Sequence, residues 1–210
     1  PMIYKGISPI LAAVLVVAFT TVVTMCMVDG ITKKSVAAML GTIIGVVFSG
    51  AFALIFGQVT SITGYNVSDI ENLVYVGEMT DIKIGELLFA GILIASLGAV
   101  MDVGMSIAST LNELKEQNPQ MMLKELFQSG MNVGRDMMGT MTNTLILAFT
   151  GGSINTLVFI FAYNYEYQQV INMYSVGIEI MQGLSSSLGV IMAVPVTSWI
   201  AAFLYSKNQK

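Results

Sequence analysis

Long apolar runs alternate with short polar segments along the whole chain. A run of roughly 20 helical residues crosses a hydrocarbon core of about 30 Å. Little of the 210-residue sequence lies outside such runs. The pattern predicts an all-α fold, a polytopic transmembrane helix bundle that forms a single domain over 1–210. The five expected spans are about 8–28, 36–58, 84–107, 137–163 and 177–205.

Local signals mark some of these spans. Ser8-Pro9 opens the first one and places proline in the first helical turn, where its missing N–H does no harm. The second span contains Gly41-x-x-x-Gly45 and then Gly50, a strip of small residues suited to close helix approach. The general tolerance of membrane helices for glycine explains this strip equally well.

The longest polar segment, 61–83, is acidic. Within it, Ser68-x-x-Glu71 resembles a capping box, in which two side chains satisfy free N–H groups at a helix start. We expect a surface loop with one short amphipathic helix near 67–76.

The second polar segment follows the third span. Asn118-Pro119 should break that helix, and we expect a charged cytoplasmic hairpin over 110–134 that includes a short interfacial helix within 120–132. In the fourth span, Gly151-Gly152-Ser153 interrupts the apolar run, so that the span bends or ends there.

Asp102 lies inside the third apolar run. Ser106, Ser109 and Glu113 follow at steps of four, three and four, which places them on the same helix face. An ionisable group at membrane depth costs several kcal/mol and is by default a functional-site hypothesis. We expect Asp102 to point into the bundle, near the fourth span, and to exchange a proton. A structural ion pair or hydrogen-bonded helix contact is the alternative.

Arg135 and Asp136 open the fourth span. Arginine at the inner end of a span can reach the water, so anchoring explains Arg135 at least as well as coupling does. Asp136 could simply favour a helix N-terminus through the dipole. Polar side chains further along are often interhelical hydrogen bonders, and a carboxylate near the outer boundary can be solvated. The candidate coupling residues are Asp102, Ser106, Arg135, Asp136, Thr140, Thr142 and Asn143, with Glu179 as a secondary candidate.

Composition then narrows the class of protein. Hydrophobic residues make up 55%, charged residues 10%, and the mean hydropathy is +0.76, outside the range of soluble domains. With no histidine and one cysteine, Cys26, we expect no disulfide framework, no cofactor and no metal site. The net charge of −4 offers no basic surface for nucleic acid. No Ser/Lys, Asp/Asp or metal constellation can be assembled, so we expect no enzyme. The expected partner is the lipid bilayer.

Basic residues predict the orientation. A cytoplasmic C-terminus leaves only Lys5 and Lys83 outside, which satisfies the positive-inside rule. The N-terminus then lies outside, which suggests that an upstream span precedes this chain. The basic residues expected inside are Lys33, Lys34, Lys115, Lys124, Arg135, Lys207 and Lys210.

Long motifs carry a family resemblance. The chain closely resembles the YibE/F family of bacterial membrane proteins, and the similarity covers essentially its whole length. The resemblance implies a multi-pass protein of the bacterial cytoplasmic membrane with a transport role. The motifs are Gly6-Ile-Ser-Pro9, Gly98-Ala-Val-Met-Asp102-Val-Gly-Met-Ser106-Ile-Ala-Ser109, Gly134-Arg135-Asp136-Met-Met-Gly139-Thr-Met-Thr-Asn143-Thr-Leu-Ile-Leu-Ala-Phe149 and Ala193-Val-Pro-Val-Thr197.

A more distant resemblance concerns mechanism. A glycine-rich span with an internal Asp, a short hairpin, then Arg and a Thr-rich span ending in Gly151-Gly152 is similar to the fourth and fifth helices of the SecD/SecF branch of the RND superfamily. There, ionisable residues between central helices couple proton movement to work outside. Asp102 matches with a one-residue offset, and Ser106 and Ser109 replace further charged residues. The resemblance implies that the five spans are helices two to six of an RND-like half.

These observations leave three classes of function. The first is an ion (proton)-coupled transporter or export subunit of unknown substrate. The alternative is a non-transporting membrane scaffold or assembly partner, and an intramembrane enzyme has least support. The glycine strips and the missing helix predict a homo-oligomer, or pairing with a homologous membrane subunit, that buries Gly41 and Gly45 or the Gly151 break.

Overall fold

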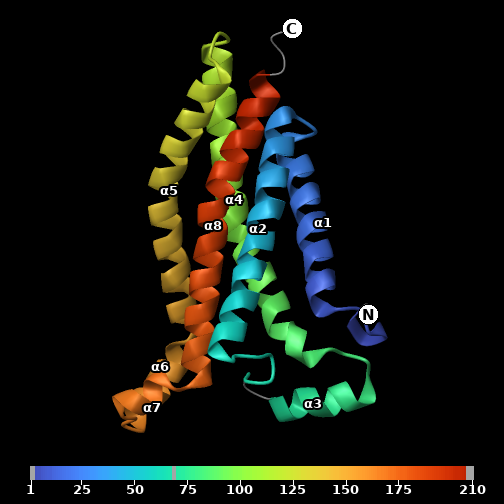
Figure 1. Cartoon of the computed structure of the whole chain (residues 1–210), viewed down its shortest axis with the longest axis vertical. Coiled ribbons are helices and arrows are strands. Elements are labelled where there is room, and N and C mark those ends of the chain that lie inside the picture. The colour runs from blue at the N-terminus through green and yellow to red at the C-terminus, as the bar shows by residue number, and fades with distance from the viewer. Residues whose placement is uncertain (1–2, 68–69, 207–210) are drawn as a thin grey trace.

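The computed structural model describes residues 3–67 and 70–206, and helices are the one regular structure in these residues (Figure 1). This confirms the all-α prediction. Two short 3₁₀ segments, Ile3–Lys5 and Ile84–Glu86, precede longer helices. The helices are α1 (Pro9–Asp29), α2 (Lys33–Thr60), α3 (Ile70–Met79), α4 (Leu87–Gln117), α5 (Leu123–Gly152), α6 (Ile154–Ala162), α7 (Tyr167–Ile171) and α8 (Tyr174–Ser206).

Within the described residues, α1, α2, α4 and α8 are each long and apolar enough to cross a membrane, and the bent pair α5 and α6 makes a fifth span if the two helices are counted as one. Figure 1 places the α1–α2 turn, the α4–α5 turn and the end of α8 at one end of the bundle, here called the upper end. The start of the chain, α3, α6 and α7 lie at the opposite, lower end. The chain is therefore a multi-pass membrane protein with four or five spans, and successive long helices run in opposite directions.

The start of α1 and α2 follows from local chemistry. Pro9 is the first residue of α1, and the Ser8 hydroxyl caps the helix by accepting a hydrogen bond from the Leu11 N–H at 3.5 Å. Gly30, with a positive φ of 67°, ends α1. Thr32 caps α2 in the same way, accepting from the Ser35 N–H at 3.2 Å. The predicted opening of the first span is confirmed.

The centre of the bundle is the contact of α2 with α8. A Cβ atom at Gly41 would lie 1.9 Å from Thr197 Oγ1, and one at Gly45 would lie 2.8 Å from Ala193 Cβ. The expectation of close helix approach at these glycines is confirmed. The expectation that they are buried between copies of the chain is wrong, because α8 of the same chain already covers both.

The region before the fourth span differs from the prediction. The separate interfacial helix expected within 120–132 is instead the first part of one continuous helix, α5. Gly130 and Gly134 allow α5 to pack closely on α8 over this stretch. A Cβ atom at Gly130 would lie 2.6 Å from Ser198 Oγ, and one at Gly134 would lie 2.2 Å from Val194 Cγ1. Packing against α8 therefore extends α5 toward the upper end, so that the end of α4, a short turn and the start of α5 make up 110–134. That this hairpin is cytoplasmic stays a prediction.

That turn is held by Lys115, whose Nζ donates hydrogen bonds of 2.8 Å to the carbonyls of Pro119 and Met121. At the other end of α5, the predicted interruption is confirmed. Ser153 separates α5 from α6, and the two helices are bent by 54°. A Cβ atom at Gly151 or Gly152 would meet nothing within 4 Å, so the Gly151 break lies open.

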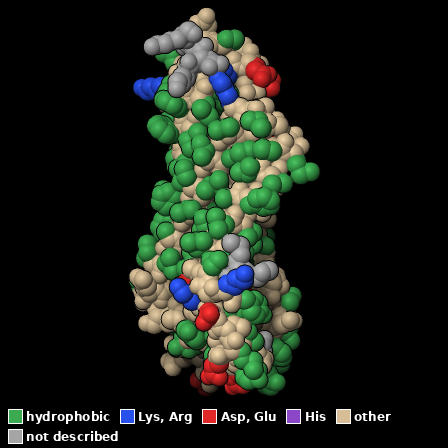
Figure 2. Space-filling model, turned by 90° about the vertical axis from the view of Figure 1, so that its right-hand side faces the viewer, with side chains coloured by type: hydrophobic (Ala, Val, Ile, Leu, Met, Phe, Trp, Pro, Cys, Tyr) green, Lys and Arg blue, Asp and Glu red, His purple; other side chains and the backbone are tan. Residues whose placement is uncertain are grey.

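The outer surface fits a bilayer. Figure 2 shows hydrophobic side chains over the middle of one face, with charged side chains toward its two ends. On α1, Leu15, Phe19 and Val22 are exposed, as expected of a helix in contact with lipid. The expected short helix near 67–76 is found as α3, at the lower end. Its proposed cap, Ser68, lies outside the described residues.

Candidate functional site

Asp102 lies on the outward face of α4. Val100, Val103 and Gly104 are buried, whereas Asp102 is exposed and Ser106 is half-buried. The polar face predicted on this helix therefore exists but points away from the bundle. The expectation that Asp102 faces the interior is wrong, because the apolar side of α4 is covered by the other helices and its polar side is left outside.

A second polar stripe runs along α5. Arg135, Asp136, Thr140 and Asn143 are exposed, and Thr142 is half-buried. Side chains at spacings of three and four share a helix face, so these groups lie together on the outward side. None of the described residues forms an ion pair with Asp102, Arg135 or Asp136. The one salt bridge among the described residues joins Lys34 to Asp29 at 2.5 Å. Among the described residues, these three charged groups therefore have no ion-pair partner.

Contacts between helices fix the depth of Asp102. A Cβ atom at Gly45 would lie 2.7 Å from Val100 Cγ1, and Val100 is two residues before Asp102. Gly45 lies 12 residues after Lys33 and 15 before Thr60, the two ends of α2. At about 1.5 Å per residue these separations are about 18 and 22 Å. Asp102 is therefore close to the middle of the bundle.

The same reasoning places Arg135 and its neighbour Asp136. Gly134, the preceding residue, contacts Val194 of α8, and the adjacent Ala193 contacts Gly45 of α2. Gly134 also contacts Ile107 of α4, five residues after Asp102, so Arg135 and Asp136 lie within about two helical turns of Asp102 along the bundle. Arg135 is 12 residues from Leu123, the start of α5, or about 18 Å along the helix. That this point is the inner end of a span stays a prediction.

The basic residues expected inside gather mostly at the upper end. Lys207 and Lys210 lie outside the described residues. Lys33 and Lys34 begin α2 at the upper end, and Lys115 and Lys124 flank the turn between α4 and α5 there. The orientation with this end in the cytoplasm stays a prediction.

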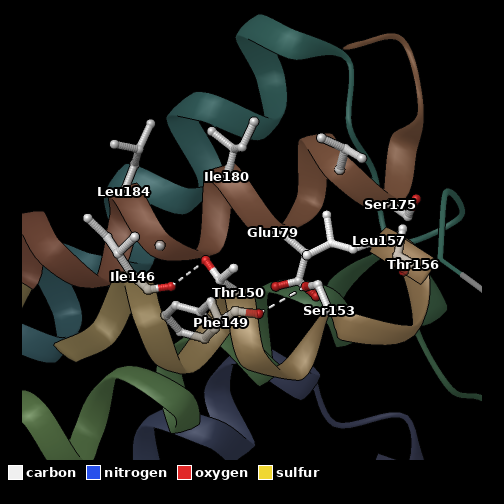
Figure 3. A pocket seen from close by; sticks show the side chains of 12 residues that line it. Ile146, Phe149, Thr150, Ser153, Thr156, Leu157, Ser175, Glu179, Ile180 and Leu184 are labelled. Atoms are coloured by element: carbon white, nitrogen blue, oxygen red, sulfur yellow. Dashed lines mark hydrogen bonds between the residues drawn. The ribbon is translucent and has the colours of Figure 1, made fainter. Parts of the chain in front are cut away.

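Glu179, the secondary candidate, lines a cavity of about 330 Å³ between α8 and the bent pair α5 and α6. The side chain is half-buried and points toward Ser153 at the bend (Figure 3). The walls of the cavity are mostly apolar. They include Ile146, Phe149, Leu157, Val176, Ile180 and Leu184.

Two hydroxyl groups beside Glu179 already donate a hydrogen bond to a backbone carbonyl. Thr150 Oγ1 donates to the Ile146 carbonyl at 2.7 Å, and Ser153 Oγ donates to the Phe149 carbonyl at 3.0 Å (Figure 3). Their oxygens keep lone pairs that can accept a hydrogen bond. Glu179 forms no hydrogen bond or ion pair with any residue that the structure describes. Its carboxylate is free to bind a ligand.

Sequence reasoning missed a row of hydroxyl groups inside the bundle. Thr42 and Ser49 of α2 and Thr197 and Ser198 of α8 are fully buried, and their hydroxyl oxygens have no hydrogen-bond partner within the described part of the chain. The glycines beside them could have signalled this row, because small residues at a spacing of four mark a close helix contact. Ser185, Ser186 and Ser187 add three more buried hydroxyls on α8.

No three His, Cys, Asp or Glu side chains come together as possible metal ligands in residues 3–67 and 70–206. The absence of a metal or cofactor stays a prediction. Comparison with protein families gave one match, to the family described as YibE/F-like protein, over residues 1–207. Comparisons with curated proteins and with solved structures gave no match. The likeness to an RND half also stays a prediction.

Proposed function

This chain belongs to the YibE/F-like protein family, and from that premise we propose that it is a subunit of an ion-coupled transporter or export system, with proton as the coupling ion. In this proposal the upper end faces the cytoplasm of a bacterial cell. The observation that supports it is that Asp102, Arg135 and Asp136 are all exposed on outward faces of α4 and α5, within about two helical turns of one another near the middle of the bundle.

In this proposal the middle of the bundle lies at the middle of the bilayer, where three charges cannot remain in contact with lipid without a large cost. Each one costs about 2.5–3.5 kcal/mol by insertion scales, so the three together cost about 7.5–10.5 kcal/mol. Contact with a protein partner or with water would remove this cost. A carboxylate at such a boundary can exchange a proton when its charged neighbour or its access to water changes. This is the physical requirement of ion coupling.

The partner proposed here is a second copy of the chain or a homologous subunit. In a two-fold pair about the membrane normal, residues at equal depth face each other. Arg135 of one copy would then meet Asp136 or Asp102 of the other, so that the surface complements itself in charge. Gly139, near these residues, has open space around it and would allow the helices to approach closely.

Proton flux in proteoliposomes tests the coupling. The purified protein is reconstituted with a trapped pH-sensitive dye, and an imposed gradient drives the flux. We expect Asp102→Asn and Asp136→Asn to abolish it while the protein still folds and inserts. The matched control is Glu113→Gln, an exposed carboxylate on the same face of α4 but nearer its end. Flux that is absent from the parent protein, or unchanged in both Asp variants, would contradict the proposal.

Charge exchange tests the pairing. Arg135→Glu alone, or Asp136→Arg alone, places like charges opposite each other and should reduce the fraction of paired copies in lipid. The double variant restores opposite charges and should restore pairing. Energy transfer between labelled copies in vesicles measures this fraction. A parent protein that is monomeric at all protein-to-lipid ratios would leave homologous pairing as the remaining form of the proposal.

A membrane scaffold is the second candidate, because the same charges could join two subunits without moving an ion. A scaffold should tolerate Asp102→Asn, since a neutral amide keeps the size and the hydrogen bonding of the side chain. Normal pairing and normal growth in cells with this variant, together with no flux in the parent protein, would favour the scaffold. We propose no enzymatic reaction for either candidate.

A further inference from the structure

We infer that the cavity between α8 and the bent pair α5 and α6 binds an amphiphilic ammonium compound, whose positive head lies at Glu179. The inference concerns a different part of the molecule from the polar surface at Asp102, and it does not depend on the proposed transport.

The cavity has the form of a small-molecule site. Its volume of about 330 Å³ falls within the range of roughly 300–1,000 Å³ that is usual for ligand pockets. It exists because α6 turns away from α5 by 54° at Ser153, while α8 continues straight past the bend. The apolar side chains of Phe149, Leu157 and Ile180 line it, and these suit a hydrocarbon ligand.

The polar groups of the cavity favour a cation. Glu179 is the one ionisable residue among those that line it, and no basic side chain does so. Thr150 and Ser153 have donated their hydrogens to backbone carbonyls, so both present acceptor oxygens. A carboxylate flanked by acceptors binds a hydrogen-bond donor with positive charge. An anionic head would be repelled by Glu179, and a neutral head would leave its charge unpaired.

A metal ion fits this cavity less well than an ammonium group does. Calcium takes six to eight oxygen ligands and usually more than one carboxylate, whereas one carboxylate and a few hydroxyls are present here. The long apolar walls would also contribute nothing to binding an inorganic ion. They do contribute when the ligand carries an alkyl chain, because each buried CH₂ group gains about 0.8 kcal/mol.

Equilibrium dialysis with radiolabelled octylammonium tests the inference. The protein is held in lipid nanodiscs, and empty nanodiscs give the background from partition into lipid. Octanol and octanoate carry the same chain with a neutral and a negative head. We expect saturable binding of octylammonium at one site per chain, weaker binding of octanol and none of octanoate.

Two variants separate the head site from the apolar walls. Glu179→Gln should weaken octylammonium by about tenfold, as expected for loss of a hydrogen bond to a charged group, and should leave octanol unchanged. Gly183→Leu should block both, because the new side chain extends toward Phe149, which lies 3.8 Å from the position of its Cβ atom. Glu166→Gln removes an exposed carboxylate at the same end and should change neither ligand.

Three outcomes would overturn the inference. The first is the absence of saturable binding of octylammonium above the empty-nanodisc background. The second is equal affinity for octanol and octylammonium, which would mean an apolar cavity without a role for Glu179. The third is unchanged binding in both Glu179→Gln and Gly183→Leu, which would place the ligand elsewhere. The thermal unfolding of each variant shows whether a loss of binding comes from a loss of fold.

Discussion

The contact of α2 with α8 predicts that Gly45→Ala weakens the fold. The new Cβ atom would lie 2.7 Å from Val100 Cγ1, 2.8 Å from Ala193 Cβ and 3.2 Å from the Gly189 carbonyl oxygen. Val100 can rotate away. The atoms of Ala193 and Gly189 are fixed to the backbone of α8, so the whole helix must move.

The size of the effect follows from these contacts. Inserting one carbon into a packed core costs about 1–3 kcal/mol, and two rigid contacts favour the upper part of that range, about 2–3 kcal/mol. Alanine recovers about 1 kcal/mol because it is a better helix former than glycine. The net loss of about 1–2 kcal/mol should lower the melting temperature by about 2–8 °C in a chain of this length.

Thermal unfolding in mild detergent measures this change, with the folded fraction read from size-exclusion chromatography after heating. The matched control is Gly98→Ala on α4, where a Cβ atom would meet nothing within 4 Å. This variant should be as stable as the parent or more stable by up to about 1 kcal/mol. The two substitutions make the same chemical change and differ only in what surrounds it.

Equal melting temperatures for the two alanine variants would refute the close packing of α2 on α8. Pairing between copies gives a second measurement. Gly45→Ala should leave the paired fraction in lipid unchanged, because Gly45 is covered within the chain. A loss of pairing at an unchanged melting temperature would instead place Gly45 between copies.

Three further predictions test other parts of the structure. In a Cys26→Ser background, Thr140→Cys should form a disulfide between copies under mild oxidation, whereas Phe19→Cys, on exposed α1, should not; the reverse result would move the pairing surface to α1. Cysteines at Glu116 and Tyr167 should be labelled from opposite sides of the membrane, and labelling of both from one side would overturn the arrangement of spans. Lys115→Met should lower the melting temperature by about 2–8 °C through loss of about 1–2 kcal/mol of hydrogen bonding at the α4–α5 turn, while Lys124→Met, an exposed lysine beside it, should have no effect.

Features set by neighbouring residues could be predicted from the sequence. Ser8-Pro9 starts α1 and Ser153 ends α5 as expected, because caps and breaks depend on groups within one turn. The start of α5 could not be predicted in this way. Whether 123–134 forms a separate helix or the first part of α5 depends on Gly130 and Gly134 meeting α8, which is a contact between distant parts of the chain.

The candidate site also has one feature that the sequence predicts and others that depend on distant contacts. The shared face of Asp102 and Ser106 follows from helix periodicity, but its direction depends on which side the neighbouring helices cover. A polar face in a membrane helix can point toward the bundle or toward a partner with the same sequence pattern. The cavity at Glu179 requires residues of α5 and α6 to meet α8 across a bend, and no local signal gives the angle of that bend.

The flanking helices give the bundle two unlike sides. Around the central group of α2, α4 and α8, α1 packs on α4 and α2, and α5 packs on α8 and α4. The free surface of α1 is apolar, whereas that of α5 carries Arg135 and Asp136. The molecule therefore has two different sides within the plane of the membrane. A two-fold assembly through α5 would cover the charged side in both copies and leave the apolar surface of α1 facing lipid on the outside, which favours an assembly of two copies.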